Sequence, residues 1–169
     1  MRNRTQRLVL LAMLVAGAAV LHIVESWLPV PLPVPGAKLG LANVVTLAVV
    51  LHFGLKEALV VSAMRALLGS LLGGTFLTLG FFLSLSGGLA SALAMGVLRR
   101  TMGDKVGATG LSLVGAVTHN VTQLMVAVVL VSHIGLFVYL PFLLFVAVPT
   151  GYFVGLVGNL LYKHMPPWR

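Results

Sequence analysis

The stretch LVLLAMLVAGAAVLHIVESWL, residues 8–28, is an apolar run with about the length that a membrane-spanning α-helix requires. It follows a basic segment, 1–7, and a cleaved secretory signal begins in the same way. A signal peptide has a shorter apolar core that ends at a small-residue cleavage site, whereas this run continues through Ile23 and Val24 to Trp27. We therefore interpret residues 8–28 as an uncleaved first transmembrane helix.

The composition of the whole chain favours the same interpretation. Of its 169 residues, 59% are hydrophobic and 8% are charged, whereas a typical soluble domain carries about 25% charged residues. A lipid bilayer is a suitable solvent for so many apolar side chains. The net charge of +8 comes from short segments between apolar runs, which is typical of contact with anionic lipid and not of nucleic-acid binding. The chain has no cysteine, which excludes disulfides and thiolate metal sites.

Breakers between the apolar runs predict one all-α transmembrane domain, 1–169, a bundle of about six helices. The predicted ranges are 8–28, 39–54, 57–74, 77–98, 107–132 and 137–162. The second and third are short for a hydrocarbon core of about 30 Å, so a single re-entrant or broken unit is an alternative for this pair. The segment 29–38 contains four prolines and is predicted to be a stiff, extended loop across one membrane face.

The distribution of basic residues predicts the orientation. With the N-terminus inside, the external loops hold only Lys38, and the cytoplasmic segments hold nine basic residues: Arg2, Arg4, Arg7, Lys56, Arg99, Arg100, Lys105, Lys163 and Arg169. Cytoplasmic loops of membrane proteins carry an excess of Lys and Arg. We therefore expect a multi-pass protein of the cytoplasmic membrane with both termini in the cytoplasm.

Arg65 is the most costly side chain in the predicted helices, because a charge at the bilayer centre costs roughly 2.5–3.5 kcal/mol on insertion scales. Ser62, Gly69 and Gly73 lie on the same helical face and are small. A guanidinium with this much space beside it can bind an anionic ligand. The alternatives are an internal ion pair with Glu25, which lies near the outer end of the first helix, or snorkelling to the interface.

Other polar residues cluster at the depth predicted for Arg65. The fifth helix contains His119, Asn120 and Gln123 near its centre, and His119 and Gln123 share a face at i, i+4. Asn43 on the second helix and Ser84 on the fourth lie in the outer half of the membrane under the predicted topology. A serine in a membrane helix usually satisfies its own backbone, so Ser84 alone is weak support. Together these residues predict a polar pocket that opens outward beneath the proline-rich loop.

The sequence offers little catalytic chemistry of its own. Its three carboxylates, Glu25, Glu57 and Asp104, are far apart in sequence, so no aspartate-rich pair can hold magnesium against a diphosphate. No His, Asp or Glu cluster has metal-ligand spacing, and no phosphate-binding loop for ATP is present. We expect neither a metal, nor a cofactor, nor enzymatic activity in this chain. Any ATPase that drives transport would be a different chain.

Five stretches carry a family resemblance: GAKLGLANVVTL (36–47), KEA (56–58), RALLGSLLGGTF (65–76), SLSGG (84–88) and GAVTHN (115–120). They resemble the family called Gx transporter, also labelled heptaprenyl diphosphate synthase component I. That family is in turn similar to the substrate-binding S components of energy-coupling-factor transporters. This resemblance implies six helices, an outward-facing site under the loop after the first helix, and a helix-one contact with a transmembrane coupling protein through small residues, here Ala12 and Ala16.

The two family labels imply different functions. The transporter label implies a membrane subunit that binds a small molecule for uptake, such as an anionic vitamin, a quinone precursor or an isoprenoid, with Arg65, His119, Asn120, Gln123, Asn43, Glu25 and Ser84 as its ligand-binding residues. The synthase label implies a subunit of a prenyl diphosphate synthase, which would be non-catalytic because the aspartates are absent. The predicted polar pocket and topology favour the transporter interpretation.

Overall fold

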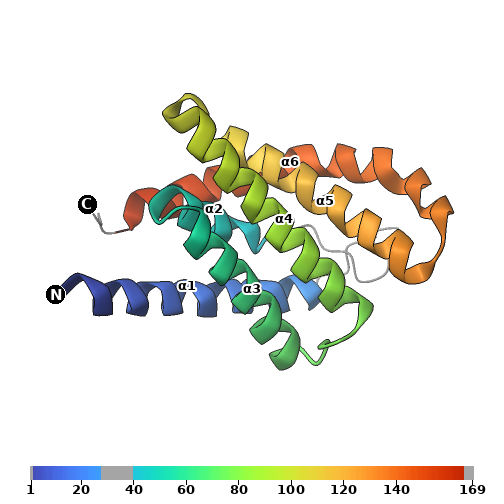
Figure 1. Cartoon of the computed structure of the whole chain (residues 1–169), viewed down its shortest axis with the longest axis horizontal. Helices are drawn as coiled ribbons and strands as arrows, with labels where there is room; N and C mark the ends of the chain where they lie inside the picture. The colour runs from blue at the N-terminus through green and yellow to red at the C-terminus, as the bar shows by residue number, and fades with distance from the viewer. Residues whose placement is uncertain (1, 28–39, 166–169) are drawn as a thin grey trace.

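The computed structural model describes residues 2–27 and 40–165, which form six α-helices and two short 3-10 helices (Figure 1). The α-helices are α1 Arg2–Trp27, α2 Asn43–His52, α3 Leu55–Leu72, α4 Leu79–Met102, α5 Ala108–Val131 and α6 Leu140–His164. The 3-10 helix η1, Gly103–Lys105, follows α4, and η2, Ile134–Tyr139, precedes α6. The described residues contain no strand, which confirms the prediction of an all-α membrane bundle. The predicted loop at 29–38 lies outside the described residues.

The helices differ in their capacity to cross a bilayer. Four segments are long and apolar enough, namely α1, α4 with η1, α5, and η2 with α6. The helix α3 has 18 residues but carries Lys56, Glu57 and Arg65. The helix α2 has only 10 residues, so at 1.5 Å per residue it is about 15 Å long, half of a typical hydrocarbon core. By itself α2 cannot span a membrane.

The short helix α2 lies inside the bundle. It contacts each of the other five α-helices, and successive contacts join α1 to α3, α3 to α4, α4 to α5 and α5 to α6. All residues from Asn43 to Val50 are buried, as expected for a helix in which all of these except Asn43 and Thr46 are apolar. Small residues allow close approach, as at Gly158 of α6, where an added Cβ would lie 2.7 Å from Leu47 Cδ2. The bundle therefore encloses a buried half-length helix.

Two glycines with positive φ define the limits of α2. The sequence predicts a helix from residue 39, but Gly40 has φ +82° and α2 begins at Asn43. At the other end, Gly54 has φ +98° and its N–H donates to Val49 O at 3.1 Å, in a turn that separates α2 from α3. Residues other than glycine rarely adopt this backbone conformation. The pair α2 and α3 is thus two helices joined by a tight turn.

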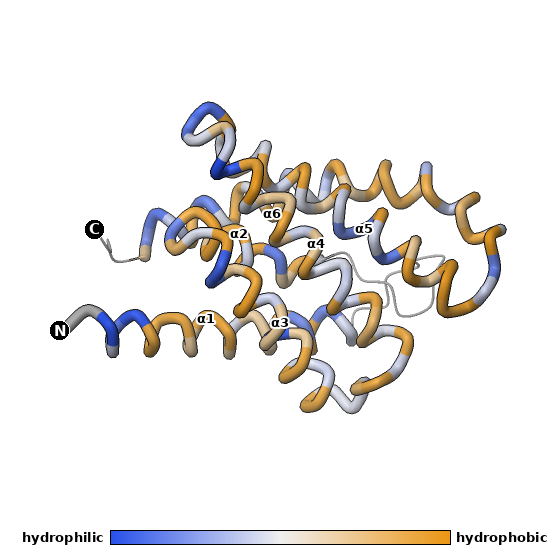
Figure 2. The backbone as a smooth tube through the Cα atoms, in the orientation of Figure 1, coloured by the Kyte–Doolittle hydropathy of each residue, from blue (hydrophilic) through white to orange (hydrophobic). Residues whose placement is uncertain are grey.

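Hydrophilic segments gather at one end of the bundle, which we call the basic end (Figure 2). The start of α1 and the end of α6 both lie there (Figure 1), which is what two cytoplasmic termini require. Large apolar side chains such as Val129, Phe145 and Leu160 are exposed along the outer surface, where lipid would surround them. The described residues that form the basic end are Arg4, Arg7, Lys56, Arg99, Arg100, Lys105 and Lys163.

Candidate functional site

Arg65 lies in the interior of the bundle, on the face of α3 that packs against α2 and α4, and its side chain is 2% exposed. Its Nη2 donates a hydrogen bond to Asn43 Oδ1 of α2 at 2.8 Å. On α4 the opposing residue is Gly88, where an added Cβ would lie 2.6 Å from Arg65 Nη2 and 2.7 Å from Ser62 Oγ. A side chain at position 88 would therefore displace the guanidinium or the Ser62 hydroxyl from its present position.

Glu25 acts on Arg65 electrostatically without forming a direct ion pair. Its Oε1 accepts hydrogen bonds from the backbone N–H groups of Gly40 at 2.5 Å and Leu41 at 3.2 Å. A coulombic interaction with Arg65 remains. Within the described residues, the ion pairs shorter than 4.0 Å are Arg7–Glu57 and Arg99–Asp104. The predicted alternative, an internal pairing of Arg65 with Glu25, is thus represented by this charge interaction. Glu25 also fixes the backbone that leads into α2.

Gly40 is the point where three of the predicted site residues meet. Besides its bond to Glu25, an added Cβ at Gly40 would lie 3.0 Å from Asn43 Nδ2 and 3.3 Å from His119 Cδ2. Asn43 in turn holds Arg65. Contacts through Gly40 and Asn43 thus connect side chains from α1, α2, α3 and α5 at one depth of the bundle.

The α5 part of the site consists of His119 and Gln123, both 2% exposed. Gln123 Nε2 and His119 Nε2 lie 2.8 Å apart in a hydrogen bond between successive turns. They pack against Gly87 of α4, where an added Cβ would lie 2.9 Å from Gln123 Cγ and 3.0 Å from His119 Nδ1. Gly87 therefore lets α4 pack against His119 and Gln123, and the adjacent Gly88 lets it pack against Arg65.

Two other predicted ligand residues differ in their placement. Asn120 is buried, but its Nδ2 donates to Leu143 O of α6 at 2.9 Å, so this amide joins α5 to α6. Ser84 is buried one turn before Gly88 on α4. Ala12 and Ala16 are exposed on α1, as a contact with another membrane protein would require. The structure thus groups Arg65, Asn43, Glu25, His119 and Gln123, and it places Asn120 on a separate interface.

Several polar atoms of this layer are buried without a hydrogen-bond partner in the described part of the chain. They are Arg65 Nε and the hydroxyl oxygens of Thr46, Ser62, Ser84 and Ser91. A buried polar group left unsatisfied costs about 1–3 kcal/mol, and more when the group is charged. Native proteins contain only a few such groups per 100 residues, so these atoms, among them Arg65 Nε and the neighbouring Ser62 hydroxyl, need an explanation. Unused donors of this kind are available to a ligand.

A small cavity lies beside this cluster. A cavity of about 10 Å³ lies next to Asn43, with Gly40, Ser91 and Ser112 in its wall. That volume accommodates about one water molecule. Ser91 and Ser112 are buried polar residues that the sequence-based prediction omitted, because a serine in an apolar helix gives no sign of which way it faces. A ligand larger than water would need more space than this cavity has.

Comparison with known proteins gives one family. The family described as heptaprenyl diphosphate synthase component I matches residues 14–161, which cover most of the chain and every site residue named above except Ala12. No curated protein and no solved structure is significantly similar to the chain. No group of three or more His, Cys, Asp or Glu side chains that could hold a metal ion occurs in the described residues.

Proposed function

This chain belongs to the heptaprenyl diphosphate synthase component I family, and we propose that it acts as a membrane-embedded subunit that binds a small anionic molecule for uptake. The observation that carries the proposal is the buried Arg65 guanidinium, which has one neutral hydrogen-bond partner and an unused Nε donor. A permanent charge of this kind within a membrane bundle favours a ligand or ion pathway as its role.

The chemistry of the site favours an anionic ligand. A planar guanidinium binds carboxylate or phosphate through two parallel hydrogen bonds, which a neutral amide such as Asn43 cannot reproduce. The hydroxyl of Ser62 lies beside it and can donate a further bond. Since Glu25 is held by two backbone amides, a ligand carboxylate would become the closest counter-charge to Arg65.

Access to the site is proposed to depend on Glu25. Its carboxylate holds the amides of Gly40 and Leu41 over the layer that contains Asn43 and His119. Release of these two hydrogen bonds would allow the backbone of Gly40 and Leu41 to shift and enlarge the one-water cavity. An anion that binds Arg65 would promote this release, because its negative charge repels the Glu25 carboxylate.

Energy for uptake would come from other chains. On this proposal the exposed small residues Ala12 and Ala16 of α1 contact a transmembrane coupling protein, which ATPase subunits drive in turn. The helix α1 lies at one side of the bundle, where a partner helix can reach it (Figure 1).

A second candidate function follows from the family description. "Component I" implies at least one further component, and this chain would then be the non-catalytic membrane subunit of a prenyl diphosphate synthase. Its three carboxylates do not form a cluster, because Glu25 is buried beside Gly40 while Glu57 and Asp104 pair with Arg7 and Arg99. Chain elongation would therefore be catalysed by the partner.

A ligand screen separates the two candidates. The purified chain in lipid nanodiscs would be heated with each member of a panel of vitamins, flavins, quinone precursors and isoprenoids, and its melting temperature would be measured. We expect one anionic class to stabilise the wild type, to fail with Arg65→Leu, and to stabilise the control Lys105→Gln as well as the wild type. No stabilisation by any compound, together with altered product length when the chain is mixed with a soluble prenyl synthase, would favour the second candidate.

A further inference from the structure

A larger cavity, of about 470 Å³, lies at the basic end between the α2–α3 turn and the C-terminal part of α4. Small-molecule sites typically have volumes of roughly 300–1,000 Å³. Part of its wall is apolar and is formed by Val50, Phe53 and Leu55. The rest carries charge, with Lys56, Arg99 and Arg100 as cations and Glu57 as the single anion. The cavity is therefore amphipathic and opens where lipid headgroups would lie.

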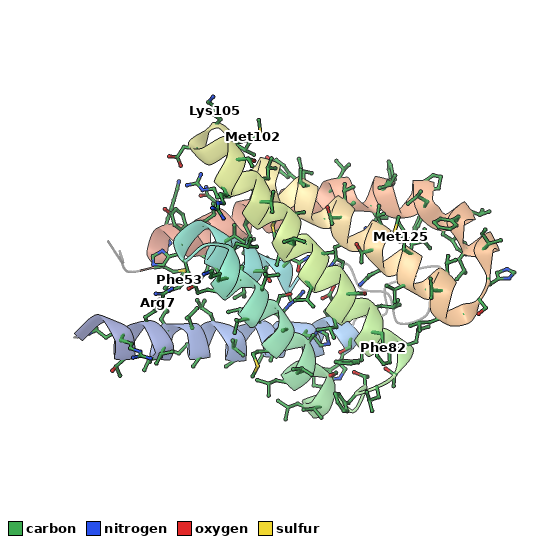
Figure 3. The ribbon with its side chains drawn as sticks, viewed as in Figure 1. Arg7, Phe53, Phe82, Met102, Lys105 and Met125 are labelled. Atoms are coloured by element: carbon green, nitrogen blue, oxygen red, sulfur yellow. The ribbon has the colours of Figure 1, made fainter. Side chains whose placement is uncertain are left out.

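Glu57, the anion in this wall, is paired with a cation from α1. Arg7 forms an ion pair with Glu57, and its guanidinium also lies over the Phe53 ring, 5.6 Å from the ring centroid. Figure 3 shows Arg7 and Phe53 next to each other at this end of the bundle. Of the cations, Arg99 is paired with Asp104 at 2.6 Å and donates to Gly103 O at 2.9 Å.

Lys56 and Arg100 supply the unbalanced charge of the cavity. Neither has a hydrogen-bond or ion-pair partner within residues 2–27 and 40–165. Membrane topology accounts for basic residues at this end, but it does not require them to line a concave surface. Lys105 and Lys163 belong to the same end and lie outside the cavity wall. Two free cations next to an apolar wall match a phosphate group attached to a hydrocarbon chain.

We propose that this cavity binds a phosphate group, with Lys56 and Arg100 as its ligands and with the apolar wall against the attached chain. Basic pockets between transmembrane helices on the cytoplasmic side of a membrane bind anionic lipid headgroups in this way. The phosphate can come from an anionic phospholipid or from a water-soluble phosphate ester. The partly exposed apolar residues Phe53 and Leu55 favour the lipid, since a soluble ester would leave them uncovered.

The test uses the full chain in phosphatidylcholine nanodiscs. Short-chain phosphatidylglycerol, glycerol 3-phosphate and inorganic diphosphate would be titrated separately, and binding would be followed by native mass spectrometry and by melting temperature. The site variant is the double substitution Lys56→Gln with Arg100→Gln. The matched control is Lys105→Gln with Lys163→Gln, which removes the same charge from the same end. All three proteins should melt alike without ligand, because the four residues are exposed.

Each basic residue near a membrane surface contributes about fivefold to binding, so the site variant should bind phosphatidylglycerol about 30-fold more weakly than the wild type. The affinity of the control for phosphatidylglycerol should stay within about threefold of the wild-type value, because its two lost charges act on the lipid only at long range. Binding of phosphatidylglycerol alone supports the lipid as the source, and equal binding of glycerol 3-phosphate supports the soluble ester. Equal losses in the two variants, or no binding of any of the three compounds, would overturn the proposal.

Discussion

The substitution Gly88→Ala tests whether α4 forms a close lid over the Arg65 guanidinium. An added Cβ would lie 2.6 Å from Arg65 Nη2 and 2.7 Å from Ser62 Oγ, whereas ordinary contact begins at 3.4 Å. The guanidinium would have to move by about 0.8 Å, the difference between 2.6 Å and the 3.4 Å of ordinary contact. A shift of this size away from Asn43 would stretch the 2.8 Å hydrogen bond from Arg65 to Asn43 beyond hydrogen-bonding range.

The expected cost combines overpacking with the lost bond. Overpacking costs about 1–3 kcal/mol, and a hydrogen bond to a charged group is worth about 1.5–3 kcal/mol. Alanine regains about 1 kcal/mol of helix propensity over glycine. We therefore expect Gly88→Ala to destabilise the protein by about 1.5–5 kcal/mol and to weaken binding of any anionic ligand of Arg65.

The matched control for this substitution is Gly17→Ala on α1, because an added Cβ there meets nothing within 4 Å. Thermal unfolding of both variants in nanodiscs should show a clear decrease for Gly88→Ala and no decrease for Gly17→Ala. In an Arg65→Leu background the cost of Gly88→Ala should shrink, since Nη2 is gone. Equal stability and equal ligand binding of the two alanine variants would refute the close contact at position 88.

Three further outcomes follow from the structure. Glu25→Ala removes two hydrogen bonds to backbone amides, so hydrogen exchange at Gly40 and Leu41 should accelerate at least tenfold, and unchanged exchange would contradict the anchoring role. Asn120→Ala removes the hydrogen bond to Leu143 O and should cost about 1 kcal/mol of stability, while ligand affinity stays within twofold. A large loss of affinity would show that Asn120 contacts the ligand. The chain has no cysteine, so Lys105→Cys introduces a single site for thiol labelling. Membrane-impermeant thiol reagents should reach it only from the cytoplasmic side, and labelling from outside would contradict the predicted topology.

The helices were predictable because apolar runs of this length have few alternatives. Their ends depend on neighbours that a sequence pattern does not contain. The helix α2 begins at Asn43 and not at 39, because the N–H of Gly40 bonds to Glu25 from a different helix. At its C-terminal end, α4 continues past Arg99 and Arg100 to Met102, since charged residues at an interface are good helix formers.

The site was predictable to the extent that its residues are chemically unusual in a membrane helix. Arg65, Glu25 and Asn43 stand out in any apolar segment, and the structure brings them together. The serines do not stand out. Ser86 donates to the backbone of its own helix, at Phe82 O. Ser84, two residues earlier, is buried, and its hydroxyl has no hydrogen-bond partner in the described structure.

Helix rotation explains why Asn120 and His119 contact different helices. Adjacent residues on an α-helix point about 100° apart, so His119 and Asn120 cannot both face the same neighbour. The sequence shows that both are polar but not which of them faces α6. Only the packing of α5 between α4 and α6 decides this, and it turns His119 toward Gly87 and Asn120 toward Leu143.

The central claim, that Arg65 binds an anionic small molecule, is tested most directly by the dissociation constant of the stabilising ligand for the wild type, Arg65→Lys and Arg65→Leu. The lysine variant keeps the charge but loses the two-pronged geometry, so binding should weaken about tenfold or more. The leucine variant should bind nothing and should melt close to the empty wild type, because removal of a buried charge offsets the loss of the hydrogen bond to Asn43. Unchanged ligand binding in both variants, with a large loss of stability, would contradict the account and would make Arg65 a structural residue.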